Sequence, residues 1–557
     1  MSQNSSVKKI VAYFSMEIYL SDLLANYAGG LGVLAGDILR AAADQDYSLV
    51  GMTLLNSQGY LEQQINEQGE QTESPATLDR RLLKKLPTEI SVLVGSDEVR
   101  VGVWEFMVKG VRGTSAPSYL LDTDLPVNKE EHRQLTKRLY GGDQERRLKQ
   151  AIILGRGGVK MLQALGYEVK KYHLNEGHCA FAALALFNNS QAKSNEQKVA
   201  ELKAQCLFTT HTSVKDAQNE FSQTEIRSQI PDFPVHLPGL IKNNRLSLTE
   251  MALYFSAYVN AVSLSHQRVV AKIFPNREIN YITNGVHSLT WTAPEFQTLY
   301  DKYLPGWREN NNYLEKAEQI PVAEIWAAHQ KTKARLLEYV KIKTGLSWSP
   351  DVLTIVFARR MAAYKRPELL LFDLERLLKI QATHGKMQII FAGKAHSQDE
   401  SGRKFIRDIY EIKNKYAGRL DLCFLENYEA PLAKLLVAGA DLWLNTPLVG
   451  NEASGTSGMK AAHNGVMQIS TLDGWWEEGY VPEKTGWLIS SDAESKESIN
   501  QADATNLYDV LENSVLPAYY HEPKKWQTMM RLTIARNASR FNTERVLRQY
   551  KAVYDAE

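Results

Sequence analysis

The second half of this chain contains a series of short apolar segments that constrains its fold more than any other feature. The segments are residues 352–358, 388–392, 420–425, 441–445 and 467–471, and amphipathic stretches separate them. Continuous apolar runs of this length are typical of strands that are buried on both faces of a parallel sheet. The second half is therefore predicted to be a doubly wound α/β domain.

The first half repeats this pattern less regularly. Strands are predicted at residues 10–14, 48–55, 168–174 and 205–210, and helices at 32–43 and 148–165. Because 557 residues are too many for one compact core, the chain is expected to form more than one domain. The predicted fold class is α/β, with two doubly wound Rossmann-like domains facing each other across a cleft. Ligands would bind at the carboxyl ends of both sheets.

A turn signal suggests where the two domains meet. Thr283-Asn284-Gly285-Val286 precedes a change in sequence character, so the boundary is placed at Asn284, giving domains 1–284 and 285–557. Residues 308–344 and 526–554 are predicted to be largely helical. The last helix is a candidate to pack back on the N-terminal domain.

Charge and cysteine content exclude several classes of function. The 65 basic and 64 acidic residues give a formal net charge of +1, which argues against nucleic acid or an anionic membrane as a partner. Cys179, Cys206 and Cys423 lack the spacing of a disulfide framework or a metal site, so a reducing compartment and no metal are expected. With no signal segment and no membrane-length apolar run, the protein is predicted to be soluble and cytoplasmic.

One segment combines glycines, hydroxyl side chains and a lysine. It reads Glu452-Ala453-Ser454-Gly455-Thr456-Ser457-Gly458-Met459-Lys460. The glycines allow the backbone to approach a ligand, and the hydroxyls suit phosphate or sugar oxygens. Lys460, if desolvated, could form a Schiff base with pyridoxal phosphate. Taken alone, the segment also fits a solvated surface loop with an ordinary lysine.

Two further segments follow predicted strands of the same half. Arg359-Arg360-Met361-Ala362-Ala363-Tyr364-Lys365-Arg366 follows residue 358, and Glu426-Asn427-Tyr428 follows residue 425. Clustered cations of this kind can hold two phosphates together despite their repulsion. A basic run can equally be a solvated face, so the segments must be judged together.

Together these segments resemble the α-glucan phosphorylases, the family of glycogen, starch and maltodextrin phosphorylases, in the compact form found in bacteria and archaea. Other family-like motifs occur in the family's order between about residues 13 and 474. They are Gly29-Gly30-Leu31-Gly32, Leu174-Asn175-Glu176-Gly177-His178, His211-Thr212, Ser265-His266, Thr283-Asn284-Gly285 with Trp291, and Thr471-Leu472-Asp473-Gly474.

The resemblance implies an activity and its partners. The enzyme would transfer a terminal glucosyl unit from an α-1,4-glucan or maltodextrin to inorganic phosphate, giving α-D-glucose 1-phosphate with retained configuration. Pyridoxal 5'-phosphate would be the cofactor, and its phosphate group would donate and accept the proton. A homodimer is a family expectation.

The resemblance also implies the site residues. The expected catalytic residues are Arg360, Lys365, His266 and Lys460. The expected cofactor-binding residues are Lys460, Arg359, Thr456, Ser457, Tyr19, Trp291 and Tyr428. The expected substrate-binding residues are Gly29, Gly30, His211, Asn284, Glu452, Ser454 and Gly455. In this scheme His266 and Asn284 hold the sugar's 6-hydroxyl, and the carbonyl of His266 faces the cationic transition state.

Several positions depart from the larger family members. Ala362 and Ala363 replace a His-Glu pair, Glu429 replaces a basic residue, and Gly458 replaces an asparagine. The residues after His266 and after Gly474 also differ. These changes are compatible with the phosphate site but put acceptor recognition and chain-length preference in question.

Three other functions fit parts of the sequence. A nucleotide-sugar transferase of the glycogen-synthase type would share the fold but would have no use for Lys460. A retaining glycoside hydrolase could use Glu176, Glu477 or Glu478, although their spacing identifies no acid and nucleophile pair. A glucan-binding protein without catalysis would not require the cationic cluster.

Overall fold

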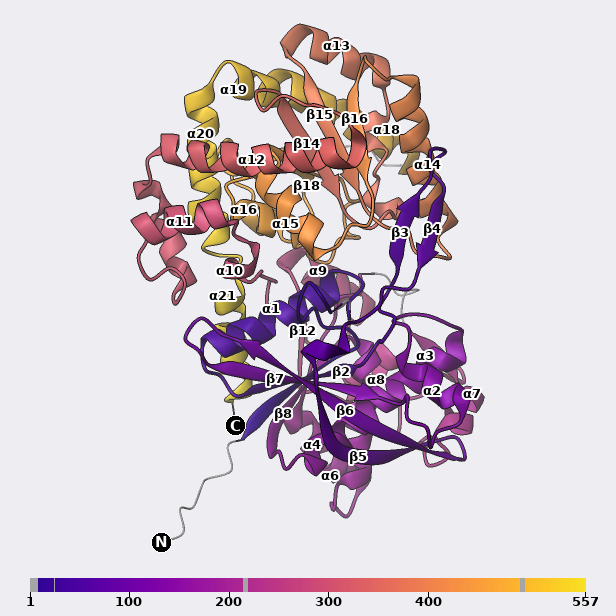
Figure 1. The fold of residues 1–557 in the computed structure, drawn as a ribbon. Helices are drawn as coiled ribbons and strands as arrows, with labels where there is room; N and C mark the ends of the chain where they lie inside the picture. The colour runs from indigo at the N-terminus through magenta and orange to yellow at the C-terminus, as the bar shows by residue number, and fades with distance from the viewer. Residues whose placement is uncertain (1–8, 25, 214–218, 491–495, 557) are drawn as a thin grey trace. The chain divides into compact units, whose positions relative to one another are not determined.

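The computed structural model describes residues 9–24, 26–213, 219–490 and 496–556. The chain forms two compact units (Figure 1). Unit 1 contains Met1–Leu61, Pro75–Thr283 and Val546–Glu557, and unit 2 contains Glu62–Ser74 and Asn284–Arg545. Each unit is therefore assembled from separate stretches of the chain.

Unit 1 is built on a nine-stranded sheet with the order β13-β12-β9-β8-β1-β2-β7-β6-β5. The strands from β13 to β7 run parallel, while β6 is antiparallel to both β7 and β5. Their bounds are β1 Ile10–Ser15, β2 Leu49–Leu54, β5 Lys84–Val94, β6 Asp97–Lys109, β7 Ser115–Asp122, β8 Val169–Asn175, β9 Cys206–Thr209, β12 Tyr258–Ala261 and β13 Asn280–Tyr281.

The connections of unit 1 are mainly helical. They comprise α1 Gly30–Asp44, α2 Glu130–Arg133, α3 Gln144–Ile152, α4 Gly158–Ala164, α5 Phe181–Asn189, α6 Asn195–Gln205, α7 Gln223–Gln229, α8 Leu248–Phe255 and α9 Leu264–Ile273, with a small hairpin of β10 Glu220–Ser222 and β11 Arg245–Ser247. A π-helical turn, Ile153–Gly157, joins α3 to α4.

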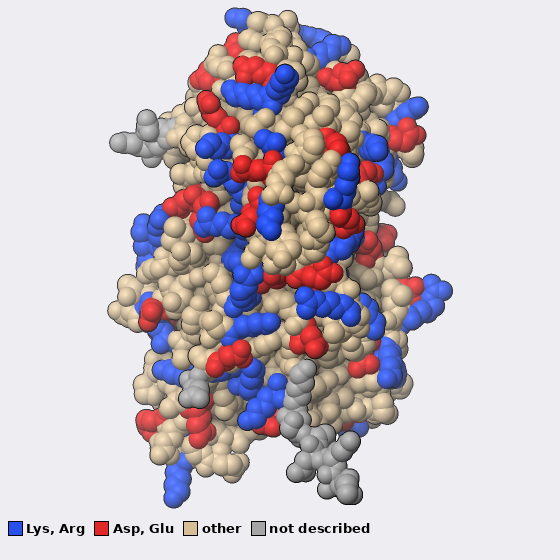
Figure 2. Space-filling view, turned by 90° about the vertical axis from the view of Figure 1, so that its left-hand side faces the viewer, with Lys and Arg blue, Asp and Glu red and all other residues tan. Residues whose placement is uncertain are grey.

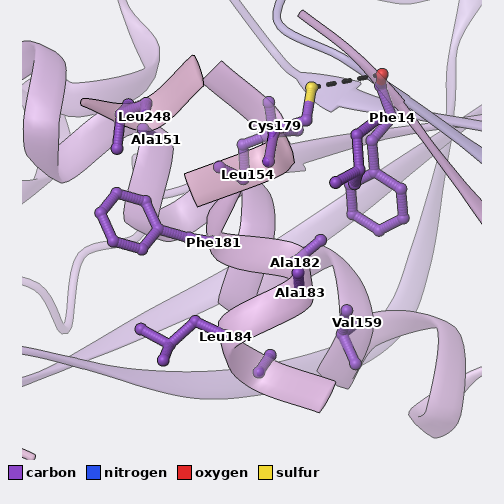
Figure 3. Close-up of a cluster of buried hydrophobic side chains, with 14 of the residues drawn as sticks. Phe14, Ala151, Leu154, Val159, Cys179, Phe181, Ala182, Ala183, Leu184 and Leu248 are labelled. Carbon is purple, nitrogen blue, oxygen red and sulfur yellow. Dashed lines mark hydrogen bonds between the residues drawn. The ribbon is translucent and has the colours of Figure 1, made fainter. Parts of the chain in front are cut away.

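The main core of unit 1 depends on close approach between helices and sheet (Figure 3). A Cβ at Gly155 would lie 2.4 Å from the backbone nitrogen of Ala182 in α5, and one at Gly158 would lie 2.4 Å from the ring of Phe14 in β1. The thiol of Cys179 donates to the carbonyl of Phe14 at 3.2 Å. Glycine at these two positions therefore lets the α3–α4 segment pack directly on its neighbours.

The end of the chain completes unit 1. The last part of helix α21, Thr543–Tyr554, contributes Tyr550 and Tyr554 to an apolar cluster that includes Val11 of β1. The Tyr554 hydroxyl bonds to His173 Nδ1 at 2.7 Å, and the Tyr550 hydroxyl bonds to Thr209 Oγ1 at 3.0 Å. Residues at opposite ends of the sequence thus share one core.

Unit 2 is built on a fully parallel six-stranded sheet with the order β16-β15-β14-β17-β18-β19. Its strands are β14 Leu353–Ala358, β15 Met387–Ala392, β16 Asp421–Leu425, β17 Leu442–Asn445, β18 Met467–Thr471 and β19 Gly486–Ile489. The strands β14, β15 and β18 are buried along their whole length, as expected for apolar strands covered on both faces.

Helices surround this sheet. They are α10 Ser288–Trp291, α11 Pro294–Tyr303, α12 Val322–Thr344, α13 Leu374–His384, α14 Glu400–Lys415, α15 Ala430–Gly439, α16 Ser457–Ala462, α17 Trp476–Gly479, α18 Lys496–Val510, α19 Leu516–Tyr520, α20 Pro523–Thr533 and the first residues of α21. A hairpin from the N-terminal sequence, β3 Glu62–Ile65 and β4 Gln71–Ser74, also belongs to unit 2 and lies beside α14 (Figure 1).

A buried ion cluster fixes helix α12 to this sheet. Asp441 accepts from His329 Nε2 at 2.8 Å, from the Lys333 ammonium, and from the backbone of Thr354 at 2.7 Å. The side chains of His329, Lys333 and Asp441 are fully buried. Because a buried charge is costly unless it is paired, this cluster specifies how α12 meets β14 and β17.

The predicted α/β class and the two large, mainly parallel sheets are confirmed. On the face shown in Figure 2, basic and acidic side chains are interspersed. No helix within the described ranges has the length and apolar content needed to cross a bilayer.

Candidate functional site

The cationic segment of unit 2, residues 359–366, lies directly after strand β14. Arg359 and Lys365 are buried at 6% and 8% exposure, whereas Arg360 is exposed. The neighbouring loop, residues 392–395, holds the start of this segment, because Arg359 N donates to Ala392 O and Met361 N donates to Lys394 O, both at 3.0 Å. The segment therefore has a fixed course at the carboxyl edge of the sheet.

Glu452 brings two of these cations together. Its Oε2 accepts from the Arg359 guanidinium and from Lys365 Nζ, the latter at 3.0 Å. Burial alone would raise the pKa of Glu452, but Arg359 and Lys365 outweigh burial and lower the pKa to about 2. Glu452 is therefore ionised at neutral pH, and the three side chains carry a net charge of about +1.

Hydrogen bonds hold the loop around Glu452, but some buried polar groups beside it have no partner. Asp473 accepts from the backbone of Glu452 at 2.9 Å, and Trp475 N donates to Ser454 O at 3.0 Å. Among the described residues, buried Arg359 Nε and Nη1 and Ser454 Oγ have no hydrogen-bond partner. Buried donors are rarely left unpaired, so this group suits an oxygen-rich anion.

Lys460 lies on a short helix rather than in the glycine-rich loop that the sequence suggests. The helix is α16, and its lysine is 7% exposed. The Lys460 ammonium lies 4.0 Å from the centre of the Trp291 ring. The helix forms because the loop ends at Gly455, whose positive φ of 77° turns the chain, and Thr456 then begins helical geometry.

A polar network sets the distance between Lys460 and Trp291. Asn464 donates to the carbonyl of Trp291 at 2.9 Å and accepts from the backbone of Ala293 at 2.7 Å. His463 Nε2 bonds to Ser288 Oγ at 2.9 Å. The two residues that follow α16 therefore fasten α10, and with it Trp291, against the lysine.

The remaining unit 2 residues flank these groups. Ser457 Oγ accepts from Trp443 Nε1 at 3.1 Å, and Thr456 is the N-cap residue of α16. Tyr428 is half-buried, and burial raises the pKa of its hydroxyl. The positive charge of Arg359 partly offsets this rise, so the hydroxyl lies near the guanidinium. Asn284 is buried, and its carbonyl accepts from Arg545 at 2.9 Å.

The structure explains two of the positions, Gly458 and Glu429, at which this sequence differs from the larger family members. A Cβ at Gly458 would lie 1.7 Å from Gln468 Oε1, so the Gln468 side chain fills the space of a larger residue there. Glu429 pairs with Lys394 at 2.7 Å, so its carboxylate is matched by a cation from the neighbouring loop. Nothing in the structure explains Ala362 and Ala363.

In unit 1 the glycine segment forms the start of helix α1. Gly29 is the N-cap, and a Cβ at Gly29 or Gly30 would meet nothing within 4 Å. The buried carboxylate of Glu17 accepts from the backbone of Ala28 and of Gly29, the latter at 3.1 Å, and from the Tyr140 hydroxyl at 2.9 Å. The first N–H groups of a helix have no intrahelical partner, so this open end suits an anion.

Tyr19 lies beside this segment. Its backbone N–H donates to the carbonyl of Gly32 at 2.9 Å, and its hydroxyl donates to Asp22. The Arg40 guanidinium lies 4.6 Å from the centre of the Tyr19 ring. The structure therefore places Tyr19 with the glycine segment of unit 1, whereas Lys460, Trp291 and Tyr428 belong to unit 2.

Glu176 organises the histidines of unit 1. It follows β8 with φ 76° and ψ 161°, a conformation that is essentially restricted to glycine. Its carboxylate accepts from its neighbour Gly177 N, from His211 N at 2.8 Å and from Thr212 Oγ1 at 3.0 Å. Because these bonds use both oxygens, Glu176 is a backbone anchor and is poorly placed to act as a glycosidase acid.

The histidine next to this anchor is partly exposed on a loop. His211 Nε2 bonds to Asn175 Oδ1 at 2.7 Å. Burial, together with the neighbouring His266 and His178, lowers the pKa of His211 to about 3. The imidazole is therefore neutral at physiological pH.

His266 is placed differently. It lies in helix α9 at 1% exposure, and burial lowers its pKa to about 4. Its Nε2 bonds to the carbonyl of Thr212 at 3.1 Å, so Nε2 carries the proton, and its Nδ1 accepts from Val262 N at 3.3 Å. Both ring nitrogens are thus engaged within unit 1, and helical geometry directs the His266 carbonyl along α9. This arrangement does not favour the expected contact between His266 and a sugar, and it makes His266 a support for the loop of His211.

Sequence reasoning assigned no role to the residues that hold these loops, although Asp473 lies in a family-like motif. Glu17, Asp473 and Asn464 each form a hydrogen bond with the backbone of a neighbouring segment. Their one sequence signal is a polar residue next to a predicted apolar strand or beside a motif. Glu477 and Glu478, considered as hydrolase carboxylates, lie in α17, where Glu478 is within 3.4 Å of Arg540.

A family model described as "Carbohydrate phosphorylase" matches residues 196–478, and one described as "Starch synthase catalytic domain" matches residues 22–282. Glycogen phosphorylase of Aquifex aeolicus is 37% identical over 98% of this chain and 85% of its own length. Maltodextrin phosphorylase of Thermococcus litoralis is 37% identical over 97% of this chain and 70% of its own length. Glycogen phosphorylase of Mycobacterium tuberculosis is 33% identical over 98% of this chain and 70% of its own length.

Proposed function

The chain belongs to the carbohydrate phosphorylase family of glycosyltransferase enzymes, and we propose that it phosphorolyses α-1,4-glucans. The reaction would transfer a terminal glucosyl unit to inorganic phosphate and release α-D-glucose 1-phosphate with retained configuration. The observation that carries this proposal is the buried group of Arg359, Lys365 and Glu452, whose unused donors suit a phosphate.

The unit 2 residues also fit pyridoxal 5'-phosphate as cofactor. Lys460 is buried against the face of Trp291, which suits a flat aromatic ring held covalently by a lysine. Arg359 has buried N–H groups without partners, and Thr456, Ser457 and Tyr428 add hydroxyls on nearby loops. When bound, the cofactor supplies a phosphate group that exchanges a proton with the substrate phosphate.

Binding of phosphate would change the charge balance in unit 2. Arg360 and Lys365 bind and orient inorganic phosphate in this proposal, and Arg359 binds the cofactor phosphate. As the cations turn to these anions, Glu452 is released to accept a hydrogen bond from a sugar hydroxyl. Ser454 Oγ and the backbone of Gly455 provide further partners for the 3- and 4-hydroxyls, because glycine leaves the amide accessible.

Unit 1 would contribute neutral groups. The amides of Gly29 and Gly30 bind the substrate phosphate, held in place by Glu17. We assign the sugar contact of unit 1 to His211, because it is partly exposed, and we make His266 a positioning residue. Asn284 remains the proposed partner of the 6-hydroxyl, and Tyr19 supports the glycine segment. In this scheme residues 1–284 serve the glucan and phosphate, and residues 285–557 the cofactor.

The first test is covalent. Purified protein loaded with pyridoxal phosphate is reduced with borohydride, digested and analysed by peptide mass. A pyridoxyl adduct on Lys460, together with phosphate-dependent release of glucose 1-phosphate from maltodextrin, supports the proposal. Lys460→Arg serves as the control because it keeps the charge without the reactive amine. Absence of an adduct from fully loaded protein would refute it.

A nucleotide-sugar-dependent transferase is the alternative, favoured by the starch synthase match over residues 22–282. It predicts glucosyl transfer from a nucleoside-diphosphate glucose to maltodextrin without pyridoxal phosphate. Assaying both donors with the Lys460→Arg variant separates the two functions, because the transferase would retain its activity.

A further inference from the structure

The β3–β4 hairpin, residues 62–74, has an unusual place in the molecule. Its sequence lies inside the N-terminal half, yet it belongs to unit 2. Two-stranded hairpins are only marginally stable alone, so this one depends on what it contacts. Its Gln63 and Gln71 form hydrogen bonds with unit 2, and Ile65 adds an apolar contact with the core of that unit.

Two glutamines carry these contacts. Gln63 and Gln71 are buried at 2% and 4% exposure and bond to each other at 2.8 Å. Gln63 accepts from the backbone of Asn427 at 2.8 Å, while Asn427 Oδ1 accepts from the backbone of Gln63 at 3.1 Å. A buried amide side chain is costly unless its groups are paired, so this fit is specific.

The same glutamines hold a second loop. Gln63 Nε2 donates to the carbonyl of Gly393 at 3.0 Å. Gln71 donates to the carbonyl of Ala395 at 3.0 Å and accepts from its N–H at 3.1 Å. Hairpin and loops are thus joined through main-chain groups more than 320 residues away in sequence. On the outer side, Arg403 and Arg407 of α14 pair with Glu73 and Glu70.

Both loops adjoin residues of the proposed phosphate site. Residues 392–395 form backbone bonds with Arg359 and Met361, and a Cβ at Gly393 would lie 1.9 Å from the carbonyl of Arg359. Asn427 precedes Tyr428 and has a positive φ of 56°, which an asparagine adopts at some cost unless its surroundings enforce it. The hairpin therefore binds both the loop that holds the Arg359 backbone and the residue that precedes Tyr428.

We propose that the β3–β4 hairpin is a positioning element: Gln63 and Gln71 fix residues 392–395 and 426–428, and so set Arg359 and Tyr428 for binding phosphate groups. The proposal rests on the proposed function for its ligand. The hairpin contacts no reacting atom in this scheme, and its effect passes through the two loops.

The test compares neighbouring glutamines. Gln63→Ala and Gln71→Ala remove the buried side chains, while Gln64→Ala alters the adjacent glutamine, which is exposed. Hydrogen exchange of residues 391–396 and 425–429 is measured without cofactor, and pyridoxal phosphate affinity is measured by absorbance titration. We expect faster exchange in both segments and roughly tenfold weaker affinity for the first two variants. Gln64→Ala should match the unaltered protein.

Kinetics provides a second readout. Arg360 lies between Arg359 and Met361, whose backbone groups residues 392–395 hold, so a displaced loop also moves Arg360. The KM for phosphate should therefore rise in Gln63→Ala while the KM for maltodextrin stays constant, a split that general destabilisation would not produce. If Gln63→Ala fails to fold, Gln63→Glu replaces it, since that side chain keeps its size and its acceptor but loses the donor to Gly393. Unchanged exchange and affinity in these variants would overturn the positioning role. Failure of the unaltered protein to bind pyridoxal phosphate would instead count against the proposed function, and the exchange comparison would still decide about the hairpin.

Discussion

The proposed site residues of unit 1 and unit 2 differ in how their polar groups are balanced. In unit 1 the histidines are neutral, and Glu17 and Glu176 are committed to backbone N–H groups. In unit 2, Arg359, Lys365 and Glu452 are charged and buried, and Arg359 keeps donors without partners. Unit 1 is therefore organised before any ligand arrives, whereas unit 2 is organised around charges that a ligand can redistribute.

Acidification should produce the largest difference in stability between the two units. The pKa values of His178, His211 and His266 are lowered from 6.5 to about 4, 3 and 4, so the unfolded chain binds more protons than the folded one below pH 6.5. Each histidine should then cost about 1.4 kcal/mol of stability per pH unit as the pH falls from 6.5 towards 4. In unit 2, His463 shares this shift, and Glu452 adds a loss only between about pH 4.5 and 2.

Two probes distinguish the units in that experiment. All tryptophans except Trp104 lie in unit 2, so fluorescence reports mainly on unit 2. Hydrogen exchange of residues 205–212, corrected for intrinsic rates, reports on unit 1. We expect exchange protection in unit 1 to fall at higher pH than the tryptophan signal changes. Simultaneous transitions would remove the electrostatic distinction between the units.

Glu452→Ala should have the next largest effect, since it leaves Arg359 and Lys365 buried without a counter-charge. Loss of one partner from a buried pair costs about 3–5 kcal/mol, to be measured by urea denaturation. Inorganic phosphate should restore more stability to this variant than to the unaltered protein. Asp408→Ala, which removes the partly exposed partner of the exposed Lys404 in α14, is the control and should cost about 1 kcal/mol or less. Equal responses to phosphate would argue against an anion site at Glu452.

Glu176→Ala tests the role of the buried carboxylate that holds the backbone in unit 1. It would leave the N–H groups of Gly177 and His211 without their partner, at a cost of about 1–3 kcal/mol. The KM for maltodextrin should rise more than the KM for phosphate, because the affected loop carries His211. Glu168→Ala, an exposed glutamate paired with Lys9, serves as control. A larger change in the phosphate KM than in the maltodextrin KM would assign Glu176 a different role.

Gly30→Ala should have the smallest effect on stability. A Cβ there meets nothing within 4 Å, so the free energy of unfolding should change by about 0.5 kcal/mol or less. The added methyl would nevertheless obstruct a phosphate at the start of α1, and the KM for phosphate should rise. Gly32→Ala is the contrasting variant, because its Cβ would lie 2.7 Å from Glu17 Oε2 and should destabilise unit 1. An unchanged phosphate KM in Gly30→Ala would remove this helix end from the proposed site.

Much of the sheet structure could be predicted from the sequence because buried parallel strands are continuously apolar. The segments 352–358, 388–392 and 467–471 correspond to β14, β15 and β18 within one residue at each end. The antiparallel strands β5 and β6 were not predicted, because buried apolar residues alternate with exposed polar residues along them and they contain no continuous apolar run. The position of the β3–β4 hairpin in unit 2 could not be predicted, because its partners lie more than 320 residues away and a local sequence pattern does not indicate such a contact.

The site was only partly accessible from sequence. The family resemblance indicated Arg359, Lys365, Glu452 and Lys460, which lie on segments that follow predicted strands of unit 2. It also implied different roles for His266 and His211, but it could not show that one lies inside a helix and the other on a loop. The difference arises from tertiary hydrogen bonds, in which Thr212 O fixes the His266 tautomer and Glu176 fixes the loop.

The interleaving of the two units limits how the molecule can be divided. A gene cut at codon 284 would give an N-terminal fragment without Val546–Glu557, exposing the surface that Tyr550 and Tyr554 cover. The complementary fragment would lack Glu62–Ser74 and leave the backbone groups of Gly393, Ala395 and Asn427 without their glutamine partners. Neither fragment corresponds to a complete unit, so separate expression should give two aggregation-prone polypeptides, while co-expression allows each to supply the piece that the other lacks.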